Sequence, residues 1–281
     1  MGNFSRRSLL QTAAAVAARL AAAPARPGSF RVGVTDWNLQ LAGKVEAVAL
    51  ARKIGFDGVE VSLGRNPAAG RLPLDNPELQ AQYLAAAREQ GIALAGTCLD
   101  ILHVNYLKND KLAQKWVADG IGITRKLNAR VMLMPFFGKG ELGTPAEMDY
   151  VAGVLKELAP AAEKAGVWLG LEDTISAADN VRIMERSASP AVKVYYDVGN
   201  SANRGFNVVE EIRWLGKDRI CQIHLKDKGY LGEGSIDFPQ VIKAIQETGF
   251  SGFANLETSA PSRSVDSDMA RNLAFVRRLI G

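Results

Sequence analysis

From residue 30 onward, short runs of apolar and β-branched residues alternate with longer stretches in which apolar residues recur at helical spacing. The short runs predict strands at 31–36, 58–62, 92–97, 130–134, 167–172, 192–197, 220–224 and 252–257. The longer stretches predict helices at 44–54, 77–90, 110–127, 145–165, 178–187, 208–215, 238–248 and 265–280. Eight strand–helix units in about 250 residues predict an α/β fold, a parallel sheet closed into a single (β/α)8 TIM barrel.

An open, doubly wound sheet is the alternative architecture for this alternation. No G-x-G-x-x-G follows the first expected strand, so the dinucleotide-binding signature that often accompanies the open sheet is missing. No linker or low-complexity segment divides the body of the chain. We therefore expect one TIM-barrel domain over residues 30–281, preceded by an export signal and linker over residues 1–29.

The pattern of residues 1–29 is the basis for that export signal. Arg6 and Arg7 precede an Ala-rich apolar stretch, and small residues ending at Ala25 suggest a cleavage site. This order resembles a twin-arginine signal and predicts a periplasmic or otherwise exported protein. Arg19 interrupts the apolar stretch, and the alternative is an Ala-rich amphipathic helix of a cytoplasmic protein.

The charge balance argues against a nucleic-acid partner. The chain has 34 basic and 30 acidic residues, a net charge of +4. Arg6, Arg7 and Arg19 lie in the first 25 residues, which contain no acidic residue, so the body of the chain is nearly neutral. A neutral body offers no general attraction to DNA or RNA. No apolar run approaches the roughly 20 residues of a membrane-spanning helix, so we expect no membrane partner after signal cleavage.

Four consecutive expected strands end in a residue that can bind a metal ion: Glu172, Asp197, His224 and Glu257. One polar residue at a strand end is common, because strands emerge into solvent there. Parallel barrel strands all point the same way, so these four side chains share the face where barrel enzymes build their sites. Three carboxylates and one imidazole suit one divalent ion, Mn, Mg, Co or Zn. Four protein ligands leave room for two neighbouring sugar oxygens on a six-coordinate ion.

Six motifs carry a family resemblance, and they occur in order: Gly55-Phe56-Asp57-Gly58-Val59-Glu60, Leu169-Gly170-Leu171-Glu172, Tyr196-Asp197-Val198-Gly199-Asn200, His224-Leu225-Lys226-Asp227, Gly232-Glu233-Gly234 running to Asp237-Phe238, and Asn255-Leu256-Glu257. On these residues the chain resembles the xylose isomerase-like barrel superfamily, in its sugar phosphate isomerase/epimerase group, from residue 33 to 281. The resemblance implies that the four strand-end residues are metal ligands.

The resemblance also implies a chemistry. In ketose 3-epimerases of this group the two glutamates, here Glu172 and Glu257, also serve as the acid/base pair that moves a proton through an enediolate. The expected protein is a metal-dependent isomerase or epimerase whose partner is a small sugar or keto-sugar. A metal-dependent lyase or dehydratase, similar to inosose dehydratases or to enzymes that process keto-glycosides, is the first alternative. A non-catalytic sugar-binding barrel is the second. A phosphorylated substrate fits an exported protein less well.

Two positions depart from the family pattern. Thr174 stands where many relatives have histidine or asparagine, and Asn200 stands where many have histidine. Both positions usually contact substrate or a metal-bound water in the family. Because of these two departures, fewer nitrogen atoms surround the expected ion. The specific epimerase activity of a relative therefore cannot be assigned directly to this chain.

Five side chains are expected to contact the substrate: Trp37, Glu60, His103, Asn200 and Lys226. Trp37 follows the first strand and offers an apolar wall for a sugar face. Glu60 is the last residue of the motif that runs into the second expected strand. We expect it to bind a substrate hydroxyl or to support a metal ligand. His103 lies in the loop after the third strand. Lys226 comes two residues after His224, so its side chain points to the same inward side of the strand and can reach a substrate oxygen.

Overall fold

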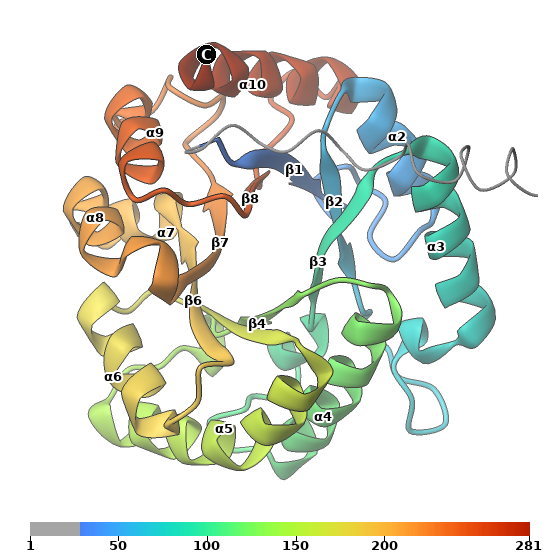
Figure 1. Cartoon of the computed structure of the whole chain (residues 1–281), viewed down its shortest axis with the longest axis vertical. Helices are drawn as coiled ribbons and strands as arrows, with labels where there is room; N and C mark the ends of the chain where they lie inside the picture. The colour runs from blue at the N-terminus through green and yellow to red at the C-terminus, as the bar shows by residue number, and fades with distance from the viewer. Residues whose placement is uncertain (1–28) are drawn as a thin grey trace, which may run out of the picture.

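The computed structural model describes residues 29–281, and in it eight strands close into one barrel (Figure 1). The strands follow one another around the barrel in chain order, and all eight neighbouring pairs are parallel. Their bounds are β1 Arg31–Thr35, β2 Gly58–Ser62, β3 Ala93–Cys98, β4 Val131–Pro135, β5 Trp168–Glu172, β6 Val192–Asp197, β7 Ile220–Leu225 and β8 Phe253–Leu256. The predicted (β/α)8 barrel is confirmed, and the open sheet is excluded.

Helices form a ring around the barrel (Figure 1). They are α2 Glu46–Ile54, α3 Pro77–Gln90, α4 Lys111–Lys126, α5 Pro145–Ala165, α6 Ala177–Ser187, α7 Val198–Asn203, α8 Val208–Arg219, α9 Phe238–Glu247 and α10 Val265–Ile280. None of the helices described from residue 29 onward has both the length and the apolar character of a membrane span. The expected export signal lies outside the described residues, apart from Ser29.

The short helix α7, which directly follows β6, was not predicted from the sequence. Its residues include Gly199 and Asn200, which are poor helix formers and hide it from a periodicity search. The helix begins because Asp197 caps it: the carboxylate accepts a hydrogen bond of 2.7 Å from the backbone N–H of Asn200. The capping residue is also one of the expected metal ligands, so α7 fixes the position of one of its two oxygens.

The longest helix shows how local sequence sets the element bounds. α5 begins at a capping box, in which the Thr144 hydroxyl and the Glu147 carboxylate each accept from the other residue's backbone N–H. It ends at Gly166, which has a φ of 69°, a left-handed conformation that glycine adopts without steric cost. Such sharp ends place each following strand in register with its neighbour.

The interior of the barrel contains polar as well as apolar side chains. An apolar group, formed by Cys98, Val131, Leu133, Tyr195 and Cys221, packs inside it. Both cysteines are free and buried, so they pack as small apolar residues. The rest of the interior includes fully buried Glu60 and Asn255 side chains.

Gly33 of β1 makes room for Asn255 on the neighbouring strand β8. A Cβ atom built at Gly33 would overlap the Asn255 Oδ1 atom, and it would lie 3.2 Å from the backbone oxygen of Gly58. The Asn255 side chain is not free to turn away, because its Nδ2 donates to Glu60 and to Tyr195. A side chain at position 33 therefore disturbs the buried polar group.

We predict that Gly33→Ala lowers the free energy of unfolding by about 1–3 kcal/mol, the usual cost of forcing extra atoms into a packed interior. Urea denaturation measures it. Gly122→Ala is the matched control, because nothing lies within 4 Å of the added Cβ and the residue is inside α4. There alanine should leave stability unchanged or raise it by up to about 1 kcal/mol. Equal effects of the two substitutions would contradict this account of Gly33.

Candidate active site at the carboxyl ends of the strands

The four expected metal ligands meet at the carboxyl end of the barrel. Glu172, Asp197 and His224 are at or near the ends of β5, β6 and β7, and Glu257 directly follows β8. One ligand atom from each lies within 4.8 Å of the other three. Glu172, Asp197 and His224 are buried and Glu257 is half-buried. Residues separated by up to 85 positions in the chain thus form one compact cluster, as their places at successive strand ends predicted.

His224 lies at the centre of this cluster. Its Nδ1 atom is 2.8 Å from Glu172 Oε1. The same nitrogen is 3.8 Å from Asp197 Oδ2 and 3.8 Å from Glu257 Oε2. The other ring nitrogen, Nε2, is 3.1 Å from Glu60 Oε2. The ring therefore turns one nitrogen toward three carboxylates and the other toward a fourth carboxylate beneath them.

Glu60 is held below the cluster by buried donors. Its Oε2 atom accepts hydrogen bonds from the Tyr195 hydroxyl at 2.6 Å and from Asn255 Nδ2 at 3.0 Å. Because Oε2 already accepts from these groups as a carboxylate oxygen, the His224 Nε2 atom is best placed to donate to it. Nδ1 faces the strand-end carboxylates, and although burial opposes it, Glu172 and Glu257 raise the pKa of His224 well above its usual value. In the metal-free protein Nδ1 therefore also donates to Glu172, and a metal ion would replace that proton.

Glu257 is fixed from two sides. Trp37 Nε1 donates to its Oε1 at 3.0 Å, and Lys226 Nζ donates to its Oε2 at 2.6 Å. Lys226 Nζ also lies 3.6 Å from Asp197 Oδ2. Burial alone would raise the pKa of Glu257, but the opposing effects of His224 and Lys226 hold that pKa below its ordinary value.

Burial dominates at the other two carboxyl groups. It raises the pKa of Asp197 to about 8, although the nearby Lys226 charge opposes this. Burial also raises the pKa of Glu172, against the opposing effect of His224. Within the described residues, the acidic groups of this cluster therefore outnumber the positively charged side chains beside them. A positive charge among these oxygens would stabilise the ionised forms.

One atom bears on whether the cluster fits a metal ion. Asp197 Oδ2 is buried and has no hydrogen-bond partner. A buried carboxylate oxygen without a donor is costly. This oxygen faces the interior of a set of three carboxylates and one imidazole, which is a donor set typical of Mn, Mg, Co or Zn. The residues present therefore fit a single divalent ion.

A cavity of about 310 Å³ opens above the cluster. Four of the five expected substrate-binding residues line it: Trp37, His103, Asn200 and Lys226. Glu60 does not line it and is completely buried beneath His224. Its position in the middle of β2 favours support of a ligand over contact with a hydroxyl, the two roles that the sequence left open.

Five further lining residues were not singled out as site residues from the sequence: Arg65, Cys98, Asp100, Pro135 and Phe137. Arg65 follows β2, and Phe137 follows β4 and stacks on His103 with 6.1 Å between ring centroids. Both lie in loops rather than at strand ends, and only their distance of two or three residues past a strand could have indicated them. Thr174 does not line the cavity, because its hydroxyl donates to Glu141 at 3.0 Å.

Known proteins share this fold, and a smaller number share recognisable sequence similarity with the chain. A 2-epi-5-epi-valiolone 7-phosphate 2-epimerase of Actinoplanes is 29% identical over 203 residues, covering 70% of this chain and 72% of that protein. The structure of D-psicose 3-epimerase with D-tagatose from Clostridium cellulolyticum H10 superposes with a TM-score of 0.74 at 16% identity, over 89% of this chain and 99% of that one. A 3-keto-D-glucoside 4-epimerase from E. coli gives 0.73 at 16% identity, over 89% and 100%. At this identity the two structures show a common fold. The xylose isomerase-like TIM barrel family matches residues 48–279, and the chain belongs to that family.

Proposed function

We propose that the protein is a metal-dependent epimerase or isomerase of a small sugar or keto-sugar. The observation that carries the proposal is the cluster of Glu172, Asp197, His224 and Glu257, whose ligand atoms lie within 4.8 Å of one another below a cavity. The family supports the reaction class, since the relative from Actinoplanes is named as a 2-epi-5-epi-valiolone 7-phosphate 2-epimerase.

The four cluster residues would hold one divalent ion. When bound, such an ion polarises the substrate carbonyl and stabilises negative charge that develops on its oxygen. Glu60 orients His224 through Nε2, so that Nδ1 stays available to the site. Lys226 and Trp37 keep the Glu257 carboxylate in place through one hydrogen bond to each oxygen.

Glu172 and Glu257 are the groups that would move the proton. They project from β5 and from the end of β8, and both line the cavity. Inversion at a carbon next to a carbonyl requires a base that removes the proton from one face and an acid that returns one on the other. Two carboxyl groups that reach the same cavity from different strands can approach a bound sugar from different sides.

The other lining residues would select and orient the substrate. Trp37 and Phe137 present aromatic faces, against which the C–H face of a sugar ring packs. Asn200, His103 and Lys226 present polar groups for its oxygens. A volume of about 310 Å³ is at the small end of ligand sites and matches a single sugar unit.

The reaction class is tested by proton exchange. The metal-supplemented protein is incubated in deuterated water with ketoses, ketose phosphates and 3-keto-glycosides, and NMR follows deuterium at carbon. We expect deuterium uptake together with formation of an epimer or isomer of one substrate class. Loss of water from the substrate would instead make the protein a dehydratase, and metal binding without any exchange would make it a non-catalytic binding barrel.

The roles of the cluster residues are separated by three isosteric variants assayed at saturating metal. Glu172→Gln and Glu257→Gln keep a neutral oxygen donor but lose the proton carrier, so each should lose about 10²–10⁴-fold in turnover or more. Asp197→Asn loses only ligand charge, and added metal should restore most of its activity. If excess metal restored all three variants equally, Glu172 and Glu257 would be ligands without a role in proton transfer.

The support of His224 by Glu60 has its own test. Glu60→Gln should weaken binding of Mn²⁺ by about 10–100-fold, as is typical when the partner of a ligating histidine is altered. Calorimetric titration measures the affinity, and circular dichroism confirms that the barrel is intact. Glu89→Gln removes one charge from an exposed site on α3 and should leave the affinity unchanged. Wild-type affinity in Glu60→Gln would show that the contact between Glu60 and His224 does not organise the site.

A further inference from the structure

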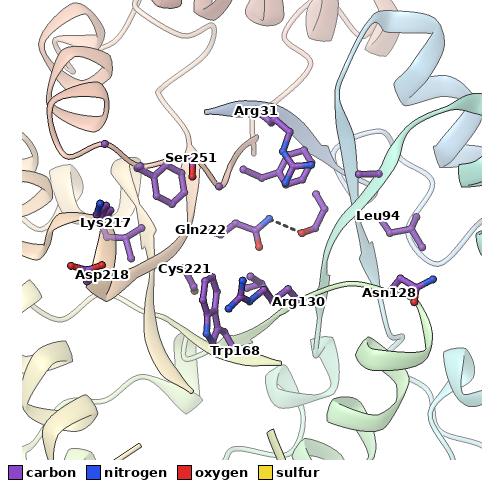
Figure 2. A pocket seen from close by; sticks show the side chains of 18 residues that line it. Arg31, Leu94, Asn128, Arg130, Trp168, Lys217, Asp218, Cys221, Gln222 and Ser251 are labelled. Atoms are coloured by element: carbon purple, nitrogen blue, oxygen red, sulfur yellow. Dashed lines mark hydrogen bonds between the residues drawn. The ribbon is translucent and has the colours of Figure 1, made fainter. Parts of the chain in front are cut away.

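A second cavity, of about 440 Å³, opens at the opposite end of the barrel (Figure 2). Its lining includes Arg31, Trp168 and Phe253, the first residues of β1, β5 and β8. We call it the amino-end cavity. No residue lines both this cavity and the one above the metal cluster. The proposed function leaves the amino-end cavity without a role.

Two arginines at the amino-end cavity have their guanidinium groups over aromatic rings. The guanidinium carbon of Arg31 is 3.9 Å from the centre of the Phe253 ring, and that of Arg130 is 3.7 Å from the centre of the Trp168 ring. Stacking restrains each guanidinium by its face and leaves its N–H groups free at the edge. Such edges are suited to carboxylate or phosphate oxygens.

Neither arginine is neutralised by an ion pair within residues 29–281. Asp57 is the acid that acts on Arg31, and both of its oxygens are engaged elsewhere. Its Oδ1 is 2.8 Å from Arg277 Nη2, and its Oδ2 accepts from the backbone N–H of Val32 at 2.8 Å.

The balance of charge around the amino-end cavity is positive. Lys217 lines it together with the two arginines, and Asp218 is the only acidic residue of the described chain among the lining residues. Three cations and one carboxylate facing a hollow lined with aromatic rings form an attractive field for an anion.

The floor of the amino-end cavity contains an unused hydrogen-bond acceptor. Gln222 is only 1% exposed, and its Nε2 donates to the backbone oxygen of Ala95 at 3.1 Å (Figure 2). Its Oε1 is buried without a hydrogen-bond partner. Gly96 makes room for this oxygen, since a Cβ there would lie 2.9 Å from it. A buried amide oxygen without a donor is unfavourable, so a ligand hydroxyl would satisfy it.

We propose that the amino-end cavity binds a small organic anion that also carries a hydroxyl group. The anionic group engages the guanidinium edges of Arg31 and Arg130, and the hydroxyl donates to Gln222 Oε1. In Figure 2 the Gln222 side chain lies between the two arginines, as this arrangement requires. The anionic group is a phosphate or a carboxylate, and the two are distinguished by experiment.

The test is a calorimetric titration of the full chain at pH 8 with four probes. Glycerol 3-phosphate and glycerate carry the charge and a hydroxyl, methyl phosphate carries the charge alone, and glycerol carries hydroxyls alone. We expect one of the first two to bind most tightly, which identifies the anionic group. Methyl phosphate should bind more weakly, and glycerol should not bind. Absence of binding by all charged probes would overturn the proposal.

Variants locate the binding. Arg31→Gln and Arg130→Gln should each weaken it about tenfold or more, because each removes a charged hydrogen-bond donor. Gln222→Met should remove the preference for hydroxylated anions over methyl phosphate. Arg88→Gln, at an exposed position of α3, is the matched control and should have no effect.

Arg65→Gln changes the cavity above the metal cluster and should also have no effect on anion affinity. A loss of affinity in Arg65→Gln, with none in Arg31→Gln or Arg130→Gln, would assign the anion to the active-site cavity and overturn the proposal. Thermal unfolding of every variant shows that the comparison is made between folded proteins. Because the cavities share no lining residue, the result does not depend on whether the proposed epimerase activity is found.

Discussion

A single buried carboxylate organises the functional end of this barrel. Glu60 is removed from water, and the hydrogen bonds that compensate for this all go to its Oε2 atom, while its Oε1 atom is buried without a partner. The donors are Tyr195 from β6 and Asn255 from β8, with the His224 ring of β7 above them. Strands far apart in the chain are thereby tied to one point. Gly33 contributes by leaving the space that Asn255 occupies.

This arrangement determines what the layer above it can do. With Nε2 of His224 directed at Glu60, Nδ1 faces the three strand-end carboxylates. Asp197 is held by the cap it forms on α7, and Glu257 is held by Trp37 and Lys226. The resulting site is rigid, rich in negative charge and open to a cavity. Those are the properties that a divalent ion and a small polyhydroxylated ligand require.

The barrel and the metal cluster were accessible to sequence reasoning because both follow from periodicity. Once strands recur at regular intervals, residues at their ends must meet at one rim, and Glu172, Asp197, His224 and Glu257 do so. The place of Glu60 was harder to predict. The shortest hydrogen bond of Glu60 is to the Tyr195 hydroxyl, and a register shift lies beside each of these residues. One shift is between β2 and β3 at Val59/Glu60, and the other is between β6 and β7 at Val194/Tyr195. Such bulges alter side-chain directions without changing the apolar pattern. The roles of the loop residues and the existence of the amino-end cavity could not be predicted. Both depend on distances across the barrel, which the spacing of residues along the chain does not encode.

Whether Glu60 turns Nδ1 of His224 toward the proposed metal ligands can be measured by ¹⁵N NMR of the histidine rings. The chain has only two histidines, so a His103→Asn variant leaves the His224 signals alone. In the protein loaded with diamagnetic Zn²⁺, the account predicts a proton on Nε2 and a metal-shifted resonance for Nδ1. A proton on Nδ1 with a metal-shifted Nε2, or ring signals that do not respond to the metal, would contradict it.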